Sequence, residues 1–379
     1  MADNLQLARV TTEPERRAFL GFPYRLYRHD PNWIPRLWPE QRAWLKRESG
    51  FFDHGDADWY IARREGEIVG TIGAAIDHHV NNALNQRYGA FGFLEFVEDY
   101  DVFAALIERA KAWLRVRGVT HMTGPQSFGS SDYPGFLVGR YDVPAALFEG
   151  HSPPYYLAFA ERAGWPRAGA DTLAYRAFRE LVEGRPEMMP AKIKHVAERV
   201  ARNPRYAIRR AELGHFEREF QIVLRLYNRS LATLPGFAPV AEDEFRRFVQ
   251  ELIPVLQEDM VLFALVDGRE VGFSLALPNL AEAFKVCGGL RYPWQYPLLW
   301  LGMRRITGVS YKILAMEPEY WGLGLEALMF ARMIEIALKR GYRWMDMSLT
   351  GEDNPQTNKL ATRLGAEEYK RYRILKVEL

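Results

Sequence analysis

Two glycines stand where a predicted strand meets a predicted helix. Gly322 and Gly324 separate an apolar strand pattern that ends at Met316 from an apolar helical stripe that begins at Leu325. Glycine lets a ligand approach the backbone closely, and the free amides and dipole at a helix N-terminus favour an anion such as a pyrophosphate. The same residues also suit an ordinary tight turn. The segment is therefore either an anion site or a turn.

A second polar stretch offers acid–base chemistry. Residues 126–133 are polar and glycine-rich and include Asp132, and His151 follows beside a run of prolines and tyrosines. Because histidine titrates near neutral pH, Asp132 and His151 are candidate catalytic residues. The stretch is either a binding loop or a plain surface excursion. Tyr311 is a third candidate, with a buried strand aromatic as the alternative.

The elements that position these residues occur twice, about 200 residues apart. Four matches keep their order along the chain: residues 25–28 with 225–228, 68–70 with 270–272, 117–119 with 340–342, and 160–164 with 361–365. Four matches in register indicate two copies of one fold. The separation along the sequence between matched residues changes from one match to the next. These changes place one insertion in each copy, at residues 126–133 and at residues 291–305.

Each copy predicts the same series of elements. A hairpin turns at Glu65-Gly66 or Asp267-Gly268, and a strand, a helix, a strand, a short helix and a last strand follow. The expected third strands are 92–97 and 311–316, and the expected last strands are 170–178 and 368–377. Asp101 is the expected cap of the first long helix. The fold class is α+β, with mixed, mostly antiparallel sheets flanked by helices. The predicted domains are 1–178 and 204–379, joined by a connector over 179–203.

The second copy resembles the GNAT acetyltransferase superfamily. The resemblance rests on Pro-Glu-Tyr-x-Gly-x-Gly after a strand, then a helix, Arg-Gly-Tyr, another strand, and Asn354 eleven residues before Gly365. It covers the chain as two tandem GNAT-like domains. It implies that acyl-CoA binds the second copy, with these residues near the cofactor: Leu314, Ala315, Met316, Trp321, Gly322, Leu323, Gly324, Leu325 and Asn354.

Several positions depart from the family pattern. Trp321 stands where the family usually has Arg or Gln, and Glu326 where it usually has a small residue, beside the expected pyrophosphate. Ala361 replaces a tyrosine that often serves as the general acid. The strand 310–316 carries no carboxylate for a general base. The first copy has Glu98-Asp99-Tyr100-Asp101 at its junction, and these acids would repel a pyrophosphate, so we expect no CoA there.

Composition limits the partners. The 379 residues are 48% hydrophobic and 26% charged, with a net charge of +2, which is too small to indicate a nucleic-acid partner. A single cysteine, Cys287, excludes an internal disulfide and a multi-cysteine metal site, and we expect no metal. No apolar run reaches membrane-span length and no signal peptide is evident, so a cytoplasmic protein is expected. The aromatic insertion at 291–305 is consistent with docking of the two copies, a homodimer contact or an acyl groove.

The resemblance implies an acyl-CoA-dependent N-acyltransferase. It would act on an unidentified small-molecule or lipid-like amine by direct attack of the amine on the thioester, polarised by the amides of Leu314 to Met316. Two alternatives stay open. One is a catalytically silent GNAT-fold binding or scaffold protein, and the other is a transferase that uses another activated donor, such as an aminoacyl or long-chain acyl group.

Overall fold

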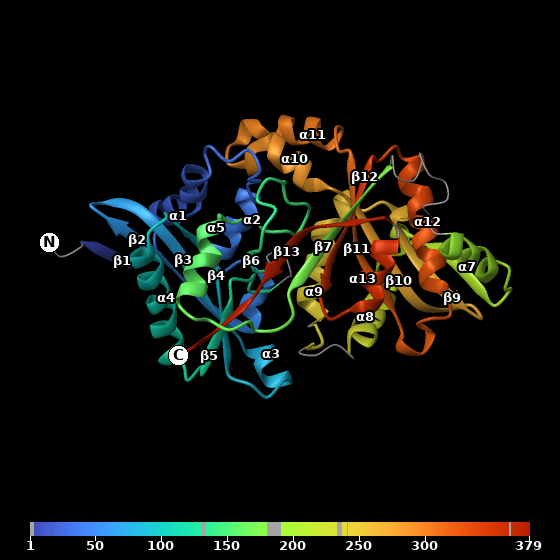
Figure 1. The fold of residues 1–379 in the computed structure, drawn as a ribbon, viewed down its shortest axis with the longest axis horizontal. Helices are drawn as coiled ribbons and strands as arrows, with labels where there is room; N and C mark the ends of the chain where they lie inside the picture. Colours follow the sequence, from blue (N-terminus) through green and yellow to red (C-terminus); the bar gives the residue numbers. More distant parts are fainter. Residues whose placement is uncertain (1–3, 130–133, 180–190, 233–236, 241, 364) are drawn as a thin grey trace. The chain divides into compact units, whose positions relative to one another are not determined.

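The computed structural model describes residues 4–129, 134–179, 191–232, 237–240, 242–363 and 365–379. The chain forms two compact units, and each is discontinuous in sequence. Unit 1 contains Met1–Thr172, Ala283–Arg304 and Lys370–Leu379, and unit 2 contains Leu173–Glu282 and Arg305–Tyr369. Figure 1 shows the elements coloured along the chain.

Unit 1 is built on a six-stranded sheet. Its strand order is β1 (Leu5–Arg9), β2 (Gly55–Arg64), β3 (Glu67–Asp77), β4 (Tyr88–Phe96), β5 (His121–Gly124) and β14 (Leu375–Glu378). The helices of this unit are α1 (Glu13–Leu26), α2 (Trp38–Leu45), α3 (His78–Ala83), α4 (Tyr100–Arg115), α5 (Pro154–Arg162) and α11 (Tyr296–Met303). Helix α4 buries the apolar stripe that its sequence predicts, including Val102, Leu106 and Trp113.

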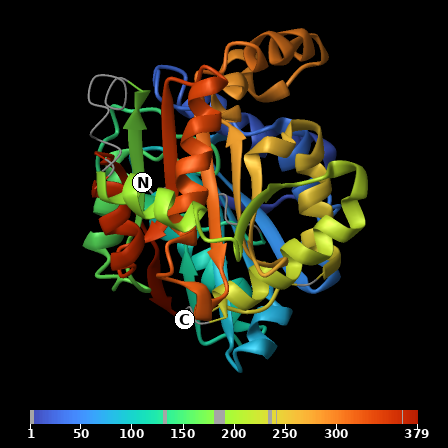
Figure 2. The same cartoon turned by 90° about the vertical axis from the view of Figure 1, so that its right-hand side faces the viewer.

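The second sheet has eight strands. Its order is β6 (Phe136–Leu137), β13 (Glu367–Arg373), β7 (Thr172–Phe178), β12 (Trp344–Gly351), β11 (Gly308–Met316), β10 (Arg269–Pro278), β9 (Val261–Val266) and β8 (Tyr206–Arg210). The remaining helices are α7 (Ala191–Ala201), α8 (Phe216–Leu231), α9 (Glu242–Leu252), α10 (Leu280–Cys287), α12 (Leu325–Lys339) and α13 (Pro355–Arg363). Residues of α7 and α12 share one core of unit 2, and residues of α8 pack into another. Figure 2 shows α12 lying along one face of the sheet.

The α+β class with mixed, mostly antiparallel sheets is confirmed, and the two hairpins have matching turns. Glu65 and Gly66 have φ of 51° and 85°, and Asp267 and Gly268 have φ of 50° and 82°. The arginine that begins the matched segments 25–28 and 225–228 makes the same contact in both copies. Arg25 donates to the Ile68 carbonyl, and Arg225 donates to the Glu270 carbonyl, two positions that correspond in the repeat.

Two details differ from the sequence prediction. The carboxylate that caps α4 belongs to Asp99, which accepts from the amides of Asp101 and Val102, so Asp101 is already inside the helix. The single strand expected at 368–377 is two strands, β13 and β14, with Ile374 between them. Strand β14 pairs with β5, so the end of the chain completes the first sheet, whereas β7 lies beside β12 in the second.

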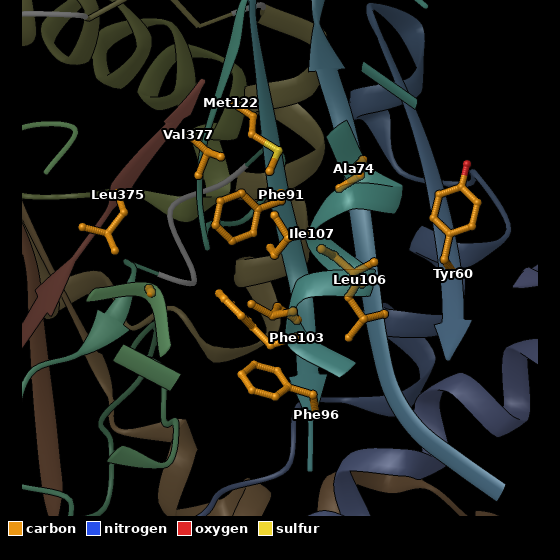
Figure 3. Close-up of a cluster of buried hydrophobic side chains, with 14 of the residues drawn as sticks. Tyr60, Ala74, Phe91, Phe96, Phe103, Leu106, Ile107, Met122, Leu375 and Val377 are labelled. Carbon is orange, nitrogen blue, oxygen red and sulfur yellow. The ribbon is translucent and has the colours of Figure 1, made fainter. Parts of the chain in front are cut away.

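The C-terminal strand contributes to the core of unit 1. Leu375 and Val377 are each 2% exposed and belong to the same buried cluster as Phe91, Leu106 and Met122. Figure 3 shows these side chains around the β4 and α4 residues. Burial of this apolar strand face stabilises the pairing of β14 with β5.

Candidate functional site

The N-terminus of α12 has the geometry of an anion site. Gly322 and Gly324 have φ of 83° and 91°, which favours glycine, and Gly324 is the N-cap residue without a side-chain cap. Gly322 is exposed, and a β-carbon there would meet no atom within 4 Å. Leu323 between them is 44% exposed. The first amides of α12 therefore lack a capping side chain in the described chain, and the loop before them is open.

Gly324 also has a packing role. A β-carbon at this position would lie 2.7 Å from Val196 and 2.8 Å from Val200 of α7. Replacement of Gly324 would therefore disturb the packing of α7 on α12, whatever the residue does for a ligand. Ion pairs hold the other end of the loop. The buried Glu317 carboxylate accepts from the half-exposed Arg225 at 2.7 Å and from Arg269 at 2.6 Å.

The corresponding helix end in unit 1 already holds a carboxylate. Asp99 Oδ1 accepts from the amides of Asp101 and Val102 at 2.9 and 3.3 Å, and Asp99 Oδ2 accepts from Arg64 at 2.6 Å. A protein carboxylate thus occupies the position that an anionic ligand would take. The two helix N-termini, at equivalent points of the repeat, differ in their capacity for an anion.

Strands β11 and β12 separate beside the glycine loop. Their parallel pairing runs from Gly308 opposite Trp344 to Tyr311 opposite Met347. Beyond this point Leu314, Ala315 and Met316 pair with β10 on one side, and no described strand pairs with their other edge. A fork of this kind leaves backbone amides and carbonyls for an extended ligand.

The equivalent fork in unit 1 is closed by the chain itself. Strands β4 and β5 pair only from Tyr88 to Ala90, and the Gln126 amide then donates to the Phe91 carbonyl at 2.9 Å. A β-carbon at Gly92 would lie 2.1 Å from the Gln126 carbonyl oxygen. The segment that begins the polar insertion therefore fills this fork.

A buried polar group joins the two strands at the base of the unit 2 fork. Lys312 Nζ lies 2.6 Å from Asp346 Oδ2 and 2.6 Å from Ser348 Oγ. The side chain of Lys312 is 7% exposed and that of Asp346 is fully buried. Sequence reasoning missed this group, since a lysine in one strand and an aspartate 34 residues later give no local signal.

Three predicted site residues of unit 2 have evident structural roles. Tyr311 is 7% exposed, and its ring meets Phe330 edge-on at 5.4 Å. Burial raises the pKa of Tyr311 well above its ordinary value, and the neighbouring Ser274 hydroxyl opposes this. Asn354 caps α13, accepting from the Thr357 amide at 3.3 Å. Trp321 packs partly buried against the α12 core.

Of the two predicted acid–base residues of the first copy, the structure describes one. Asp132 lies outside the described residues. His151 is 8% exposed, and its Nε2 is 2.6 Å from Asp30 Oδ2. Burial lowers the pKa of His151, and the negative charge of Asp30 opposes this. The structure thus gives His151 a carboxylate partner that sequence reasoning did not identify.

A carboxyl group close to this histidine was also missed. Glu95 Oε2 accepts from Tyr27 Oη at 2.6 Å and from Tyr156 Oη at 2.8 Å. The Tyr27 ring lies edge-on to the His151 ring, with centroids 5.8 Å apart. Burial raises the pKa of Glu95 to about 7, against the opposing hydrogen bonds from the two tyrosines.

An apolar groove follows α12 away from the glycine loop. Part of its space is open to solvent. The side chains that line it come from α12, β12, β11 and β7 and include Phe330, Ile334, Ala337, Leu338, Met345, Met347, Val309, Ala177 and Phe178. Met347 is the last β12 residue paired with β11, so the groove reaches the fork.

Glu326 lies at the head of the same helical stripe. It precedes Phe330 by four residues, which places both on one face of α12. Its side chain is partly buried, and its Oε2 has no hydrogen-bond partner among the residues that the structure describes. A cationic group next to this oxygen would satisfy it.

The described residues contain no group of three or more His, Cys, Asp or Glu side chains placed to hold a metal ion. None of their helices has the length and apolarity needed to cross a membrane.

The chain has the fold of tandem GNAT proteins. The structure superposes on a solved tandem GNAT protein from the clavulanic acid biosynthesis pathway with a TM-score of 0.62 at 14% identity, over 99% of this chain and 98% of the other. In sequence, the chain is 30% identical over 369 residues to Protein YghO of Escherichia coli (strain K12), which covers 96% of this chain and 93% of that protein. It belongs to the same family as YghO.

A second relative carries a functional name. The chain is 29% identical over 379 residues to a bacterial ceramide synthase of Caulobacter vibrioides (strain NA1000 / CB15N), over 98% of this chain and 97% of that protein. No protein-family model matches the chain. The fold together with this relative supports an N-acyltransferase at the family level.

Proposed function

We propose that this protein is an acyl-CoA-dependent N-acyltransferase with its donor site in unit 2. The amides at Gly322 to Leu325 would hold the pyrophosphate, and the free edge of Leu314 to Met316 would pair with the pantetheine arm. Acyl-CoA supplies an activated thioester. The chain's own contribution would be to bind and orient the donor at the fork and to donate backbone hydrogen bonds to the reacting carbonyl.

The observation that carries this proposal is the difference between two equivalent helix ends. The N-terminus of α4 is neutralised by Asp99, whereas that of α12 has two left-handed glycines and no capping side chain in the described chain. The forks differ in the same direction, because Gln126 fills the one in unit 1. Both differences favour unit 2 as the donor site.

The groove along α12 supports a donor acyl chain longer than acetyl. Its aliphatic and aromatic walls begin at Met347, beside the point where the strands separate. Each methylene buried there would strengthen binding by roughly 0.8 kcal/mol. The ceramide synthase relative supports a lipid-like acceptor, because a ceramide is an N-acylated long-chain amino alcohol. We therefore place the acceptor in the class of long-chain amines.

Calorimetric titration with CoA, acetyl-CoA and decanoyl-CoA tests the donor site. Leu323→Asp adds a carboxylate to the open loop, and Leu323→Asn, which loses the same apolar side chain, is the neutral control of nearly equal size. We expect the aspartate to weaken binding about tenfold, roughly 1.4 kcal/mol, and more at low salt. Equal CoA affinity of the two variants would show that the pyrophosphate binds elsewhere. Absence of any acyl-CoA binding by the unmodified protein would favour a scaffold or another donor.

The groove has a separate test. Ala337→Phe fills it from α12, and Ile336→Phe places the same aromatic ring on the same helix outside the residues that line the groove. We expect Ala337→Phe to weaken decanoyl-CoA binding at least tenfold and to change acetyl-CoA binding less than twofold. Equal effects of Ala337→Phe on both donors would rule out an acyl-chain site there.

A further inference from the structure

The insertion of the second copy forms an exposed, aromatic and purely basic surface. Between residues 283 and 305 the chain has four basic residues, Lys285, Arg291, Arg304 and Arg305, and no acidic residue. Five large apolar side chains of this segment have unusually high solvent exposure: Trp294 69%, Trp300 58%, Tyr296 55%, Leu298 41% and Tyr292 39%. We call the segment Tyr292–Arg305 the aromatic patch.

The inner side of the patch is fixed to unit 1. Gly302 of α11 packs directly on α10, where an added β-carbon would lie 2.9 Å from Ala283. Arg291 lies over the rings of Tyr24 and Trp38 at 5.0 and 5.4 Å. Figure 1 shows α10 and α11 side by side. The segment is thus held firmly, and its exposed aromatic side chains are presented on a supported helix.

The side chains of the patch are ordered among themselves. Tyr292 and Trp294 stack with ring centroids 4.6 Å apart and planes 5° apart. Arg304 lies 3.6 Å from the centroid of the Trp300 ring. The Arg304 guanidinium therefore lies beside an exposed tryptophan of the patch. Tryptophan, tyrosine and arginine in this arrangement suit a boundary between water and an apolar phase.

We infer that the aromatic patch docks the protein on the surface of a bilayer that contains anionic phospholipids. The eight-residue helix α11 is too short to span a membrane. It can lie in the membrane–water interface, with its Trp, Tyr and Leu side chains at the boundary between headgroups and acyl chains. Arg304 and Arg305, the two arginines of the aromatic patch, would meet the anionic headgroups. This surface is a second interaction site and goes beyond the proposed acyl transfer.

A second copy of the chain is the main competing occupant. An isologous contact through this face would bring the patch against itself, so that arginines would face arginines and no carboxylate of the segment would neutralise them. Charge complementarity therefore favours an anionic lipid surface over self-association.

Co-sedimentation with vesicles tests the inference and needs no enzymatic activity. We expect the full chain to bind vesicles of phosphatidylcholine with phosphatidylglycerol, and to bind pure phosphatidylcholine at least tenfold more weakly. Trp294→Ser with Trp300→Ser should weaken binding at least tenfold. Arg304→Gln and Arg305→Gln should each weaken it roughly fivefold, with less effect at high salt.

The matched control is Val116→Ser, which removes an apolar side chain that is 80% exposed elsewhere in unit 1. It should leave vesicle binding unchanged, and circular dichroism should show all variants folded. Three results would overturn the inference: no binding to anionic vesicles, equal loss in Val116→Ser and the tryptophan variant, or a tryptophan variant that changes only the oligomeric state in light scattering.

Discussion

At the scale of single residues, Glu326 places a carboxylate in the first turn of α12. Such a charge favours the helix dipole by itself, and it would repel a pyrophosphate bound to the same amides. Its partly buried position and its unsatisfied Oε2 make the charge costly in the free protein.

We therefore predict that Glu326→Gln tightens CoA binding by up to about tenfold, roughly 1.4 kcal/mol, and more at low ionic strength. Titration calorimetry of the variant and the unmodified protein measures this. Unchanged or weaker binding would contradict the prediction and would indicate that the carboxylate serves another partner, such as the acceptor amine.

Glu95 gives a second prediction, on pH and stability. The folded protein keeps this carboxyl protonated up to pH about 7, whereas the unfolded chain loses the proton near the ordinary pKa of 4.5. The raised pKa therefore contributes stability below pH 4.5, and this contribution is lost as the pH rises to about 7. Glu95→Gln keeps an acceptor for Tyr27 and Tyr156 and removes the charge.

We predict that Glu95→Gln matches the unmodified protein at pH 4 and is more stable by about 3 kcal/mol at pH 8. Urea unfolding across this pH range measures the difference. His151 has a lowered pKa, which acts in the opposite direction, but it is present in both proteins and cancels in the comparison. A pH-independent difference between the two proteins would contradict the prediction.

At the scale of elements, the pair of Lys312 and Asp346 holds β11 and β12 together where they begin to separate. Both side chains are buried, so removal of one partner leaves an unpaired charge in the interior. The pair therefore holds the two strands in place at the base of the fork.

We predict that Lys312→Met costs about 3–5 kcal/mol of unfolding free energy, and that Lys312→Met with Asp346→Leu recovers at least half of this loss. Chemical denaturation of both single variants and the double variant completes the cycle. A cost below about 1 kcal/mol for Lys312→Met would show that Asp346 finds another partner.

At the scale of the whole molecule, the C-terminal strand belongs to unit 1 although it follows the second copy. Leu375 and Val377 face the core of that unit, whereas Lys376 and Glu378 of the same strand point outward and pair at 3.4 Å. The last residues of the chain therefore stabilise the unit that contains its first residues.

We predict that Leu375→Ala with Val377→Ala destabilises unit 1 by about 4 kcal/mol or more, while Lys376→Ala with Glu378→Ala changes stability by less than about 1 kcal/mol. Hydrogen exchange should show the loss in β4 and β5. Protection that falls equally in both variants, or only in β11 and β12, would contradict this assignment.

The elements and their repeat could be predicted from the sequence alone. Both hairpin turns, the long helices α4 and α12, and the acidic and glycine-rich junctions follow from periodicity and turn residues, which act over a few positions. The pairing of the strands could not be predicted in this way. Alternating apolar residues predict a strand but do not specify its sheet, so only packing placed β14 beside β5 and divided the last strand at Ile374.

The chemistry of the sites divides in the same way. The glycines and the acids at the two helix ends are local signals, and they predict an anion site in the second copy. The partners of Glu95 come from 68 and 61 residues away, those of Lys312 from 34 and 36, and the partner of His151 from 121. Hydrogen bonds and ion pairs between distant residues leave no pattern along the chain, because only the fold brings their atoms within bonding distance.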